Sequence, residues 1–363
     1  MAILLSNFII NIENNFDINP EIIYQGSYGQ VREGFRKSDN FHVAIKTITD
    51  PLVSQSATKG LLREFELLAG INHPKCLKLI TFSLDPPRTV TPFMSNGTLN
   101  DFLVARNEGA DGFEKMTPTK MMCTVYGMCS TMQFLHMKGI VHRDFKPLNV
   151  FLDDNYDICI ADFGLSRRVR ENVDLTKQDF GSPAYMAPEL LEGIDYDNKI
   201  DVYSFGVTYL QYFSNLEELD DGMGPFRTAY NLLKRISEGA RFVRPSGMND
   251  AQWNVYTYCT DRNMGARPSF AEISEEFETN KELWFEGVDE DEYLRYVNDC
   301  KKIIREEKEN LEQRENLLRR DIESGESNSS DLFSSLPTTT IPIVTHTPPR
   351  PLSKSTKPKR YYV

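Results

Sequence analysis

The sequence offers little material for disulfide bonds, metal clusters or a membrane anchor. Its six cysteines are scattered through 363 residues and form no pair at metal-ligand spacing and no disulfide framework. No apolar run approaches the ~20 residues that a membrane-spanning helix needs. The apolar opening 1–5 is not preceded by a basic residue, as a signal peptide would be. These absences predict a cytoplasmic protein with reduced thiols and no membrane span.

Basic residues are in the minority, with 41 Lys and Arg against 53 Asp and Glu, which gives a net charge of -12. The segment 324–363 has five basic and two acidic residues, so it carries +3 and the rest of the chain -15. This distribution argues against nucleic acid as a ligand. The length predicts two domains or one large two-lobed domain.

The stretch 142–164 has the clearest local pattern. Two apolar runs of strand length, 150–152 and 158–161, flank a polar turn at 153–155. This pattern predicts a β-hairpin.

Four polar residues lie at the open end of this predicted hairpin. Asp144, Lys146 and Asn149 stand at its entrance and Asp162 at its exit. Carboxylate and amide oxygens are ligands that Mg²⁺ prefers, and a lysine can neutralise a phosphate. The hairpin therefore predicts a site for phosphoryl transfer.

The residues before this stretch predict a small lobe of five strands and one helix. Strand-like runs surround a turn with Gly26 and Gly29, and Lys46 shares a strand face with Ala44. A dinucleotide-binding fingerprint is excluded because a strand, not a helix, follows the glycine turn. The predicted helix, which contains Glu64, and the last two strands occupy these ranges: 58–70, 77–82 and 88–94.

The residues after Gly97 predict a mainly helical second lobe. Apolar spacing and caps place its helices at 98–104, 120–138, 202–213, 229–238, 252–260 and 270–278.

Composition changes beyond this lobe. Residues 290–323 are highly charged, with apolar residues every seven positions and charged companions, which predicts an amphipathic helix. We expect this helix to pack on the lobe or on a partner, in preference to a self-associating coiled coil. The Ser/Thr/Pro-rich basic segment 324–363 is predicted to be disordered, with a weak nuclear-import signal at 357–360.

In this order and spacing, the motifs resemble those of eukaryotic protein kinases, nearest to the tyrosine-kinase-like (TKL) group of Ser/Thr kinases of protist type. The resemblance implies a bilobal α+β fold with a five-stranded antiparallel lobe and a larger helical lobe. It covers 15–281 as a kinase domain (lobes 15–94 and 97–281). With the composition of the flanking segments, this divides the rest of the chain into an extension 1–14, a helical extension 282–323 and a tail 324–363. The resemblance further implies phosphoryl transfer from ATP, with Mg²⁺, to Ser or Thr hydroxyls of protein substrates. The amphipathic pattern of 290–323, and not the resemblance, makes this segment available to a helical partner.

The resemblance assigns residues to nucleotide and metal. Lys46 would hold the α- and β-phosphates with Glu64 as its partner, Asp144 would accept the substrate proton, and Lys146 would neutralise the γ-phosphate. Asn149 and Asp162 would hold Mg²⁺. The remaining nucleotide-binding residues would be Ile23, Tyr24, Gly26, Ser27, Gly29, Val31, Ala44, Thr91, Pro92, Met94 and Phe151. Tyr24 departs from the family, which has a glycine at that position.

Further residues would support or regulate the site. His142 and Phe163 would stack in a hydrophobic column with Leu68 and Leu79. Ser182 would bridge Asp144 and Lys146, which favours Ser/Thr specificity, as Pro147 also does. Asp201 would anchor the catalytic loop through His142, and Glu189 would pair with Arg267. Phosphorylation of Thr176 would order the activation loop.

Two alternatives stay open: a nucleotide-binding pseudokinase that acts as a scaffold, and a dual-specificity or tyrosine kinase.

Overall fold

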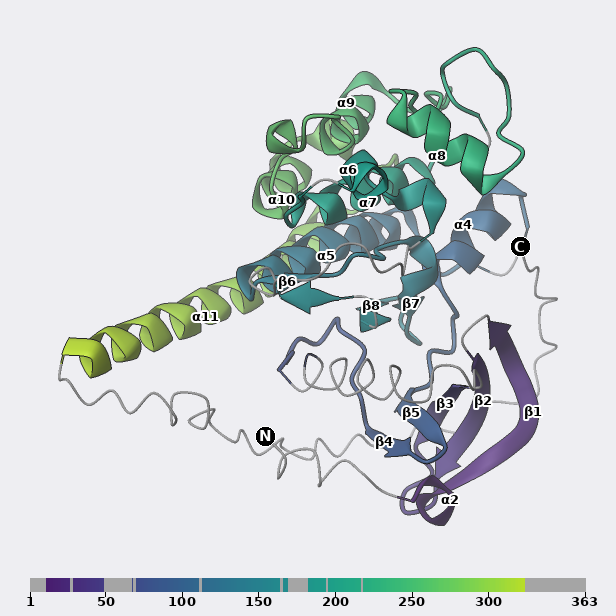
Figure 1. Cartoon of the computed structure of the whole chain (residues 1–363), viewed down its shortest axis with the longest axis vertical. Helices are drawn as coiled ribbons and strands as arrows, with labels where there is room; N and C mark the ends of the chain where they lie inside the picture. Colours follow the sequence, from purple (N-terminus) through teal and green to yellow (C-terminus); the bar gives the residue numbers. More distant parts are fainter. Residues whose placement is uncertain are drawn as a thin grey trace.

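The N-terminal lobe is a five-stranded antiparallel sheet (Figure 1). The computed structural model describes residues 11–26, 29–48, 67, 70–110, 113–163, 166–168, 182–193, 195–216 and 218–323. The sheet has the order β1-β2-β3-β5-β4, and its strands are β1 (Phe16–Gly26), β2 (Gly29–Arg36), β3 (His42–Ile48), β4 (Thr81–Leu84) and β5 (Pro87–Pro92).

Alternation along β3 gives the sheet two different faces. Val43 and Ile45 are buried, whereas Ala44 and Lys46, which point to the opposite face, are half-buried. The short helix α2 (Ile12–Asn15) covers the first of these faces, since Ile12 packs with Val43, Ile45 and Val90.

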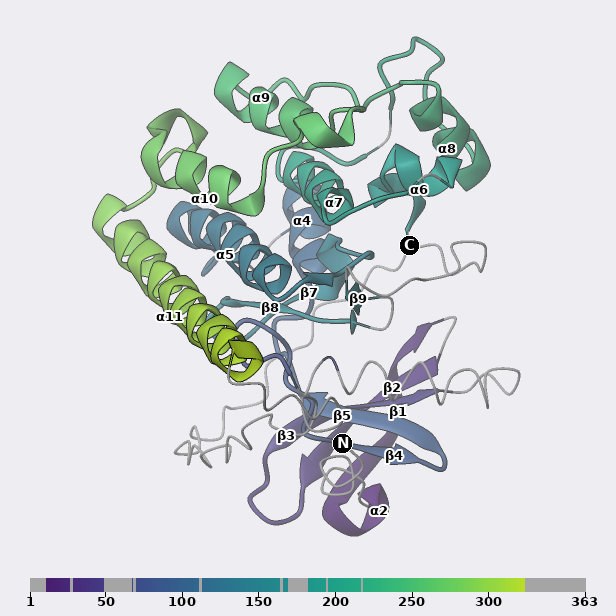
Figure 2. The ribbon, with the colours of Figure 1, turned by 60° about the vertical axis from the view of Figure 1, so that its left-hand side comes forward.

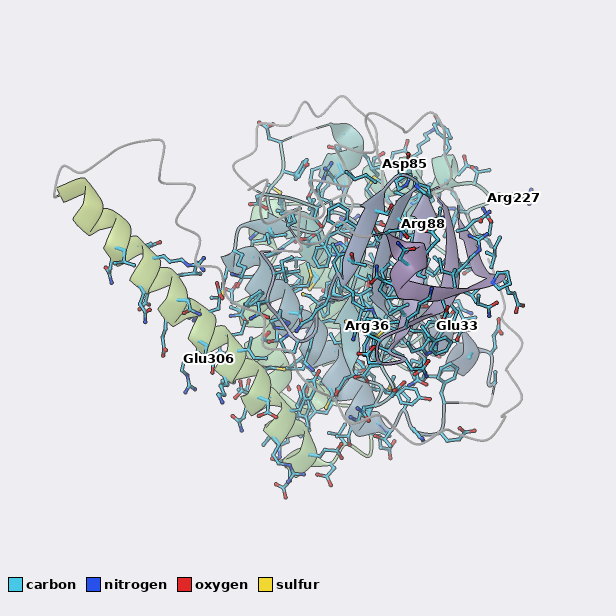
Figure 3. All side chains as sticks on the ribbon, turned by 90° about the horizontal axis from the view of Figure 1, so that it is seen from below. Glu33, Arg36, Asp85, Arg88, Arg227 and Glu306 are labelled. Atoms are coloured by element: carbon cyan, nitrogen blue, oxygen red, sulfur yellow. The ribbon has the colours of Figure 1, made fainter. Side chains whose placement is uncertain are left out.

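The helix α2 brings part of the predicted N-terminal extension into the lobe. Glu13 of α2 forms an ion pair with Arg88 of β5, which Figure 3 shows beside this helix. Residues 12–15 therefore pack as part of the sheet lobe.

The fourth strand begins four residues later than predicted. Residues 75–77 do not pair with β5; instead the Leu77 N–H donates to Ile160 O, and the Ile160 N–H donates to Lys75 O, both at 2.8 Å. These backbone bonds connect the segment to a strand of the second lobe, so β4 starts only at Thr81. Of the helix predicted at 58–70, only Leu67 and Gly70 lie within the described residues.

The second lobe is a bundle of helices around one hydrophobic core (Figure 2). α5 and α7 run through its centre, and every residue of α7 after the first is buried. The helices are α4 (Leu99–Asn107), α5 (Pro118–Met137), α6 (Pro188–Glu192), α7 (Lys199–Leu210), α8 (Ala229–Ser237), α9 (Asp250–Cys259) and α10 (Phe270–Thr279). The predicted bilobal α+β fold is confirmed.

Two small antiparallel pairs lie at the base of this lobe: β6 (Ile140–Val141) with β9 (Arg167–Arg168), and β7 (Val150–Leu152) with β8 (Ile158–Ile160). The second pair is the predicted hairpin. All six cysteines are buried and have free thiols.

The last helix, α11 (Glu290–Glu323), has the bounds that the sequence predicts. Its first half runs along α5, from Asp289, whose N–H donates to Thr119 Oγ1, to Glu307, which pairs with Lys138 at 2.7 Å. Tyr293, Val297, Cys300 and Ile304 belong to the same core as α5 and α7. Beyond Glu307 the helix projects past the lobe (Figures 1 and 3). Among the described residues, no helix has both the length and the apolar composition needed to cross a bilayer.

The buried side chain of His73 predicts acid sensitivity. It is 1% exposed, its ring centroid lies 4.6 Å from that of Phe134 of α5, and burial lowers its pKa to about 4. Because the unfolded chain binds this proton from about pH 6.5 downward, the stabilisation is complete above pH 6.5 and is lost as pH falls toward 4. We expect a loss of about 2 kcal/mol of unfolding free energy between pH 7.5 and pH 5 from this group.

Urea unfolding at both pH values measures this loss. The control is His73→Asn, whose side-chain oxygen can still accept the Lys75 N–H bond that His73 Nδ1 accepts at 3.2 Å. The variant should lose about 2 kcal/mol less than the wild type over this pH interval; equal losses would refute the assignment to His73.

Candidate active site

The register of the β7–β8 hairpin brings its two ends together. Val150 pairs with Ile160, and the Ala161 N–H donates to Asn149 O at 2.8 Å. Asn149 and Asp162 therefore flank the same end of the hairpin, as the sequence pattern requires for a shared site.

Asp144 is held by three hydrogen bonds to its carboxylate. Lys146 Nζ lies 2.6 Å and Asn149 Nδ2 3.0 Å from Oδ2, and the Ser182 N–H donates to Oδ1 at 3.1 Å. Lys146 Nζ also donates to Ser182 Oγ at 2.8 Å. The lysine thus connects the carboxylate to a hydroxyl that comes from a segment nearly forty residues later.

Asn149 has an orientation that suits a cation ligand. Its amide nitrogen donates to Asp144 O at 2.7 Å as well as to the carboxylate, which leaves its Oδ1 for another partner. Within the described ranges, no three His, Cys, Asp or Glu side chains gather as a metal cluster. An amide and a carboxylate fit Mg²⁺, which usually takes one or two protein oxygens and completes its shell with phosphates and water.

The buried carboxylate of Asp201 fixes the loop that carries Asp144. It accepts the backbone N–H groups of His142 at 2.8 Å and Arg143 at 2.9 Å, and its Oδ2 lies 2.9 Å from His136 Nε2. Arg143 has a left-handed φ of 70°. Such backbone strain in a non-glycine residue persists only where surrounding contacts enforce it, as these bonds do.

Asp162 also has a left-handed backbone, with φ 63°. The next residue, Phe163, is buried and its ring lies 5.2 Å from that of His142, whose Nε2 is 3.1 Å from Ala161 O. Leu79 is half-buried. The packing of Phe163 on His142 thus joins the segment of Asp162 to the loop of Asp144.

The predicted nucleotide-binding residues of the sheet lie in register with one another. Lys46 pairs with Val31, Val31 with Tyr24, and Ala44 with Thr91. Cross-strand partners share a face, so Tyr24, Val31 and Lys46 lie in one row. Tyr24 is 52% exposed and Ile23 is half-buried.

Glycine at position 29 is required by close backbone approach. Gly29 pairs with Gly26 on one side and with Ile48 on the other, and a Cβ at Gly29 would overlap the carbonyl group of Thr47. The close approach of β2 to β3 at this point therefore requires a residue without a side chain.

The connection between the lobes is fixed at both ends. Pro92 ends β5, Met94 O accepts the Gly97 N–H at 3.2 Å, and Gly97 O accepts the Leu152 N–H at 2.9 Å. Phe151 of β7 forms a bridge with Thr98. The connection that contains the predicted nucleotide-binding residues Pro92 and Met94 thus leads directly to the hairpin of the site.

Four predicted residues lie outside the described part of the chain: Ser27, Glu64, Leu68 and Thr176. Their roles stay predictions, as does the predicted pairing of Lys46 with Glu64.

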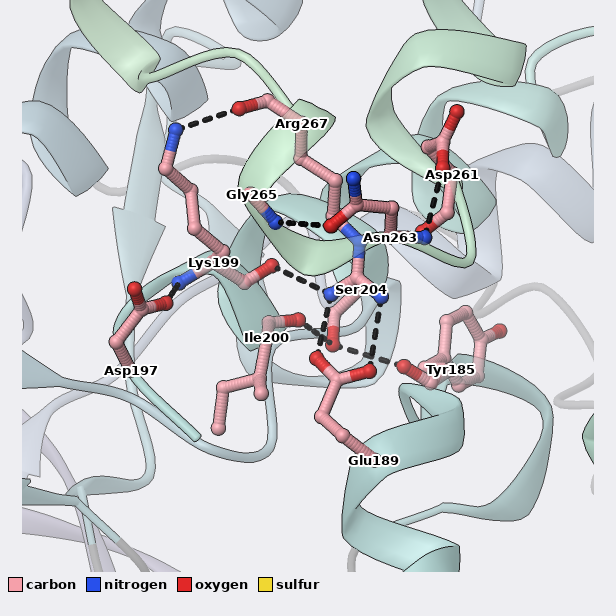
Figure 4. Close-up of polar contacts among 10 residues, drawn as sticks. All are labelled: Tyr185, Glu189, Asp197, Lys199, Ile200, Ser204, Asp261, Asn263, Gly265 and Arg267. Carbon is pink, nitrogen blue, oxygen red and sulfur yellow. Dashed lines mark hydrogen bonds and ion pairs between the residues drawn. The ribbon is translucent and has the colours of Figure 1, made fainter. Parts of the chain in front are cut away.

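Glu189 and Arg267 form a buried ion pair in the second lobe (Figure 4). Arg267 Nη1 and Nη2 donate to the two Glu189 oxygens at 2.5 and 2.8 Å, and the arginine side chain is fully buried. Lys199 Nζ donates to Arg267 O at 2.5 Å. The pair ties the segment after Ser182 to the loop that precedes α10.

Sequence reasoning missed two polar contacts near the site. His136 reaches Asp201 from α5, and Tyr185 OH donates to Gln211 Oε1 at 2.6 Å, while burial raises the pKa of the Tyr185 phenol and keeps it protonated. Both contacts join residues far apart in the chain, so no local spacing reveals them.

Comparisons with known proteins agree with this geometry. The family model described as protein tyrosine and serine/threonine kinase matches residues 19–277. A probable serine/threonine-protein kinase of Dictyostelium discoideum is 30% identical over 69% of this chain and 26% of its own length. The dual specificity protein kinase shkB of the same organism is 30% identical over 72% of this chain and 40% of its own length. The tyrosine-protein kinase receptor TYRO3 of Danio rerio is 28% identical over 76% of this chain and 32% of its own length.

The chain thus spans between about a quarter and two fifths of the length of these three relatives. The family model covers more than two thirds of the chain, including both lobes and the hairpin of Asp144 and Asp162. This chain belongs to the family of eukaryotic protein kinases.

Proposed function

We propose that the protein is a serine/threonine kinase that transfers the γ-phosphoryl group of Mg-ATP to protein Ser or Thr hydroxyls. The observation that carries the proposal is the bridge of Lys146 between Asp144 and Ser182, at 2.6 and 2.8 Å. The bridge uses a lysine and a hydroxyl that match the Ser/Thr pattern of the family.

In this proposal Asp144 orients the substrate hydroxyl and accepts its proton. The fixed carboxylate suits that task because its bonds to Lys146, Asn149 and Ser182 permit little rotation. The Lys146 ammonium, half-buried beside it, would neutralise charge on the transferred phosphoryl group.

The chain offers a matching set of groups for nucleotide and metal. Lys46 would hold the α- and β-phosphates, and Val31, Ala44, Met94 and Phe151 would surround the base. Asn149 and Asp162 would hold Mg²⁺, which supplies charge neutralisation between the phosphates when bound.

Two alternatives to this proposal are a pseudokinase scaffold and a dual-specificity or tyrosine kinase. The presence of Lys46, Asp144, Asn149 and Asp162 favours catalysis over a pseudokinase scaffold. Dual-specificity and tyrosine kinases occur among the relatives, so the choice of acceptor has to be measured.

A peptide assay tests the proposal. Purified full-length protein is incubated with γ-labelled ATP, Mg²⁺ and matched peptides that differ only in Ser, Thr or Tyr at one position. We expect kcat/KM for Ser or Thr to exceed that for Tyr by at least about tenfold, and EDTA to reduce transfer to background. Preferred transfer to Tyr would support a tyrosine kinase instead, and no transfer by folded, phosphorylated protein would support the scaffold.

We further propose a division of the chain that keeps 15–281 as the kinase domain and uses the outer part of α11 for a helical partner. The charged residues of 308–317 are exposed, and Leu317 is 57% exposed. The cytoplasmic location stays a prediction from the sequence.

A further inference from the structure

A second group of contacts connects α11 to the segment that precedes β4, away from Asp144. This segment, residues 73–77, is held from two sides. On one side His73 is buried against Phe134 of α5. On the other side lies β8, the strand that leads to Asp162.

The bonds to β8 have direct consequences for Asp162. Lys75 O accepts the Ile160 N–H and Ile160 O accepts the Leu77 N–H, both at 2.8 Å, and Cys76 forms a parallel bridge with Ile160. Ile160 stands only two residues before Asp162. A displacement of residues 75–77 therefore moves the end of β8, and with it the carboxylate proposed to hold Mg²⁺.

The side chain of Lys75 lies on α11. Its Nζ is 4.3 Å from the centroid of the Tyr296 ring, well within the range of a cation–π interaction. Tyr296 in turn occupies the space that Gly127 of α5 leaves open, since a Cβ there would overlap the Tyr296 hydroxyl.

The hydroxyl of Tyr296 forms no hydrogen bond with the described residues. Its oxygen is buried and no described residue provides a hydrogen-bond partner. The aromatic ring, not the hydroxyl, is thus the part of Tyr296 that contacts Lys75. Tyr296→Phe, which keeps the ring, and Tyr296→Leu, which removes it, therefore form a matched pair of substitutions.

We propose that Lys75 and Tyr296 are positioning residues for the phosphoryl-transfer site: α11, through the Tyr296 ring, holds residues 75–77 against β8 and thereby fixes Asp162. The inference rests on the proposed function for its activity readout. It makes α11 a part of the catalytic apparatus, although this helix lies beyond the region that the family model covers.

Substitutions at position 75 test the charge over the ring. We expect Lys75→Met to lower kcat about threefold to tenfold, in the range that one cation–π contact controls, with an unchanged KM for the peptide. Lys75→Arg retains a cation and should remain within about twofold of the wild type. The control is Lys301→Met, because the Lys301 ammonium of α11 binds Glu278 of α10 at 2.7 and 2.9 Å and not residues 73–77; its kcat should not change.

Substitutions at position 296 test the ring. Tyr296→Phe keeps the ring and should behave as the wild type, whereas Tyr296→Leu should lower kcat as Lys75→Met does. Equal kcat in Tyr296→Leu and Tyr296→Phe, both folded, would overturn the inference.

Amide hydrogen exchange provides a readout that needs no catalysis. In Lys75→Met the amides of Leu77 and Ile160 should exchange about threefold to tenfold faster than in the wild type, and in Lys301→Met they should not. Unchanged exchange in Lys75→Met overturns the inference, as does faster exchange in a protein with unchanged kcat. If Lys75→Met shows the expected faster exchange but the wild-type protein transfers no phosphate, the proposed function and the catalytic part of the inference are contradicted, and the contact itself is established.

Discussion

Asp144→Asn is expected to lower kcat by about 10²- to 10⁴-fold, the contribution of a positioned general base. The substitution preserves shape but removes the negative charge that binds Lys146 at 2.6 Å and the oxygen pair that accepts from Asn149 and Ser182. An asparagine accepts a proton from the substrate hydroxyl far less readily than a carboxylate. Single-turnover transfer from γ-labelled ATP measures the effect, with thermal unfolding to show that the variant is folded.

The matched control for this prediction is Asp154→Asn. Asp154 lies in the turn of the same hairpin, exposed to solvent, at the opposite end of the hairpin from Asp144 and Asp162, and it contacts Ser95. The same change in chemistry should leave kcat within about twofold. If Asp144→Asn transferred phosphate at the wild-type rate, another residue would have to accept the proton, and the proposed role of Asp144 would be wrong.

The largest effect on stability is expected from Arg267→Met. The guanidinium is fully buried and binds both oxygens of Glu189, which is also nearly buried (Figure 4). It also lies 5.1 Å from the centroid of the Tyr203 ring. Removal of the cation leaves a carboxylate buried without its partner, which costs about 3–5 kcal/mol. At about 2–4 °C per kcal/mol for a domain of this size, the melting temperature should fall by about 10 °C.

Two variants decide whether charge burial causes this loss. In the double variant Glu189→Leu/Arg267→Met no charge is left unpaired, so it should be more stable than Arg267→Met alone. Arg262→Met removes a neighbouring pair, Arg262 with Glu192 at 3.1 Å, which is largely exposed; it should cost less than about 1 kcal/mol. Equal losses in Arg262→Met and Arg267→Met, measured by chemical denaturation, would contradict the role of burial.

Local patterns predicted most of the architecture correctly. The alternation in β3, the hairpin at 150–160 and the heptad spacing of α11 each depend on neighbours within a few residues, and the structure has all three. The start of β4 was predicted too early because the Leu77 N–H bonds to Ile160 of β8 and not to β5, a choice of partner that apolar composition alone does not reveal.

Contacts between segments that are distant in the sequence were not predicted from local patterns. The packing of Ile12 on the sheet, the contact of His136 with Asp201 and the position of Lys75 on Tyr296 join residues 31 to 221 positions apart, and none has a local signal. The relation of Ser182 to Lys146 was expected only because the motifs resemble those of a known family, and not from spacing.

The most direct test of the account is a crystal structure of the full chain with Mg²⁺ and a non-hydrolysable ATP analogue. We expect the metal to be bound by Asn149 Oδ1 and the Asp162 carboxylate, with Lys46 Nζ at the α- and β-phosphates and the γ-phosphate facing Asp144. A nucleotide bound elsewhere, or a metal that neither Asn149 nor Asp162 touches, would contradict the account.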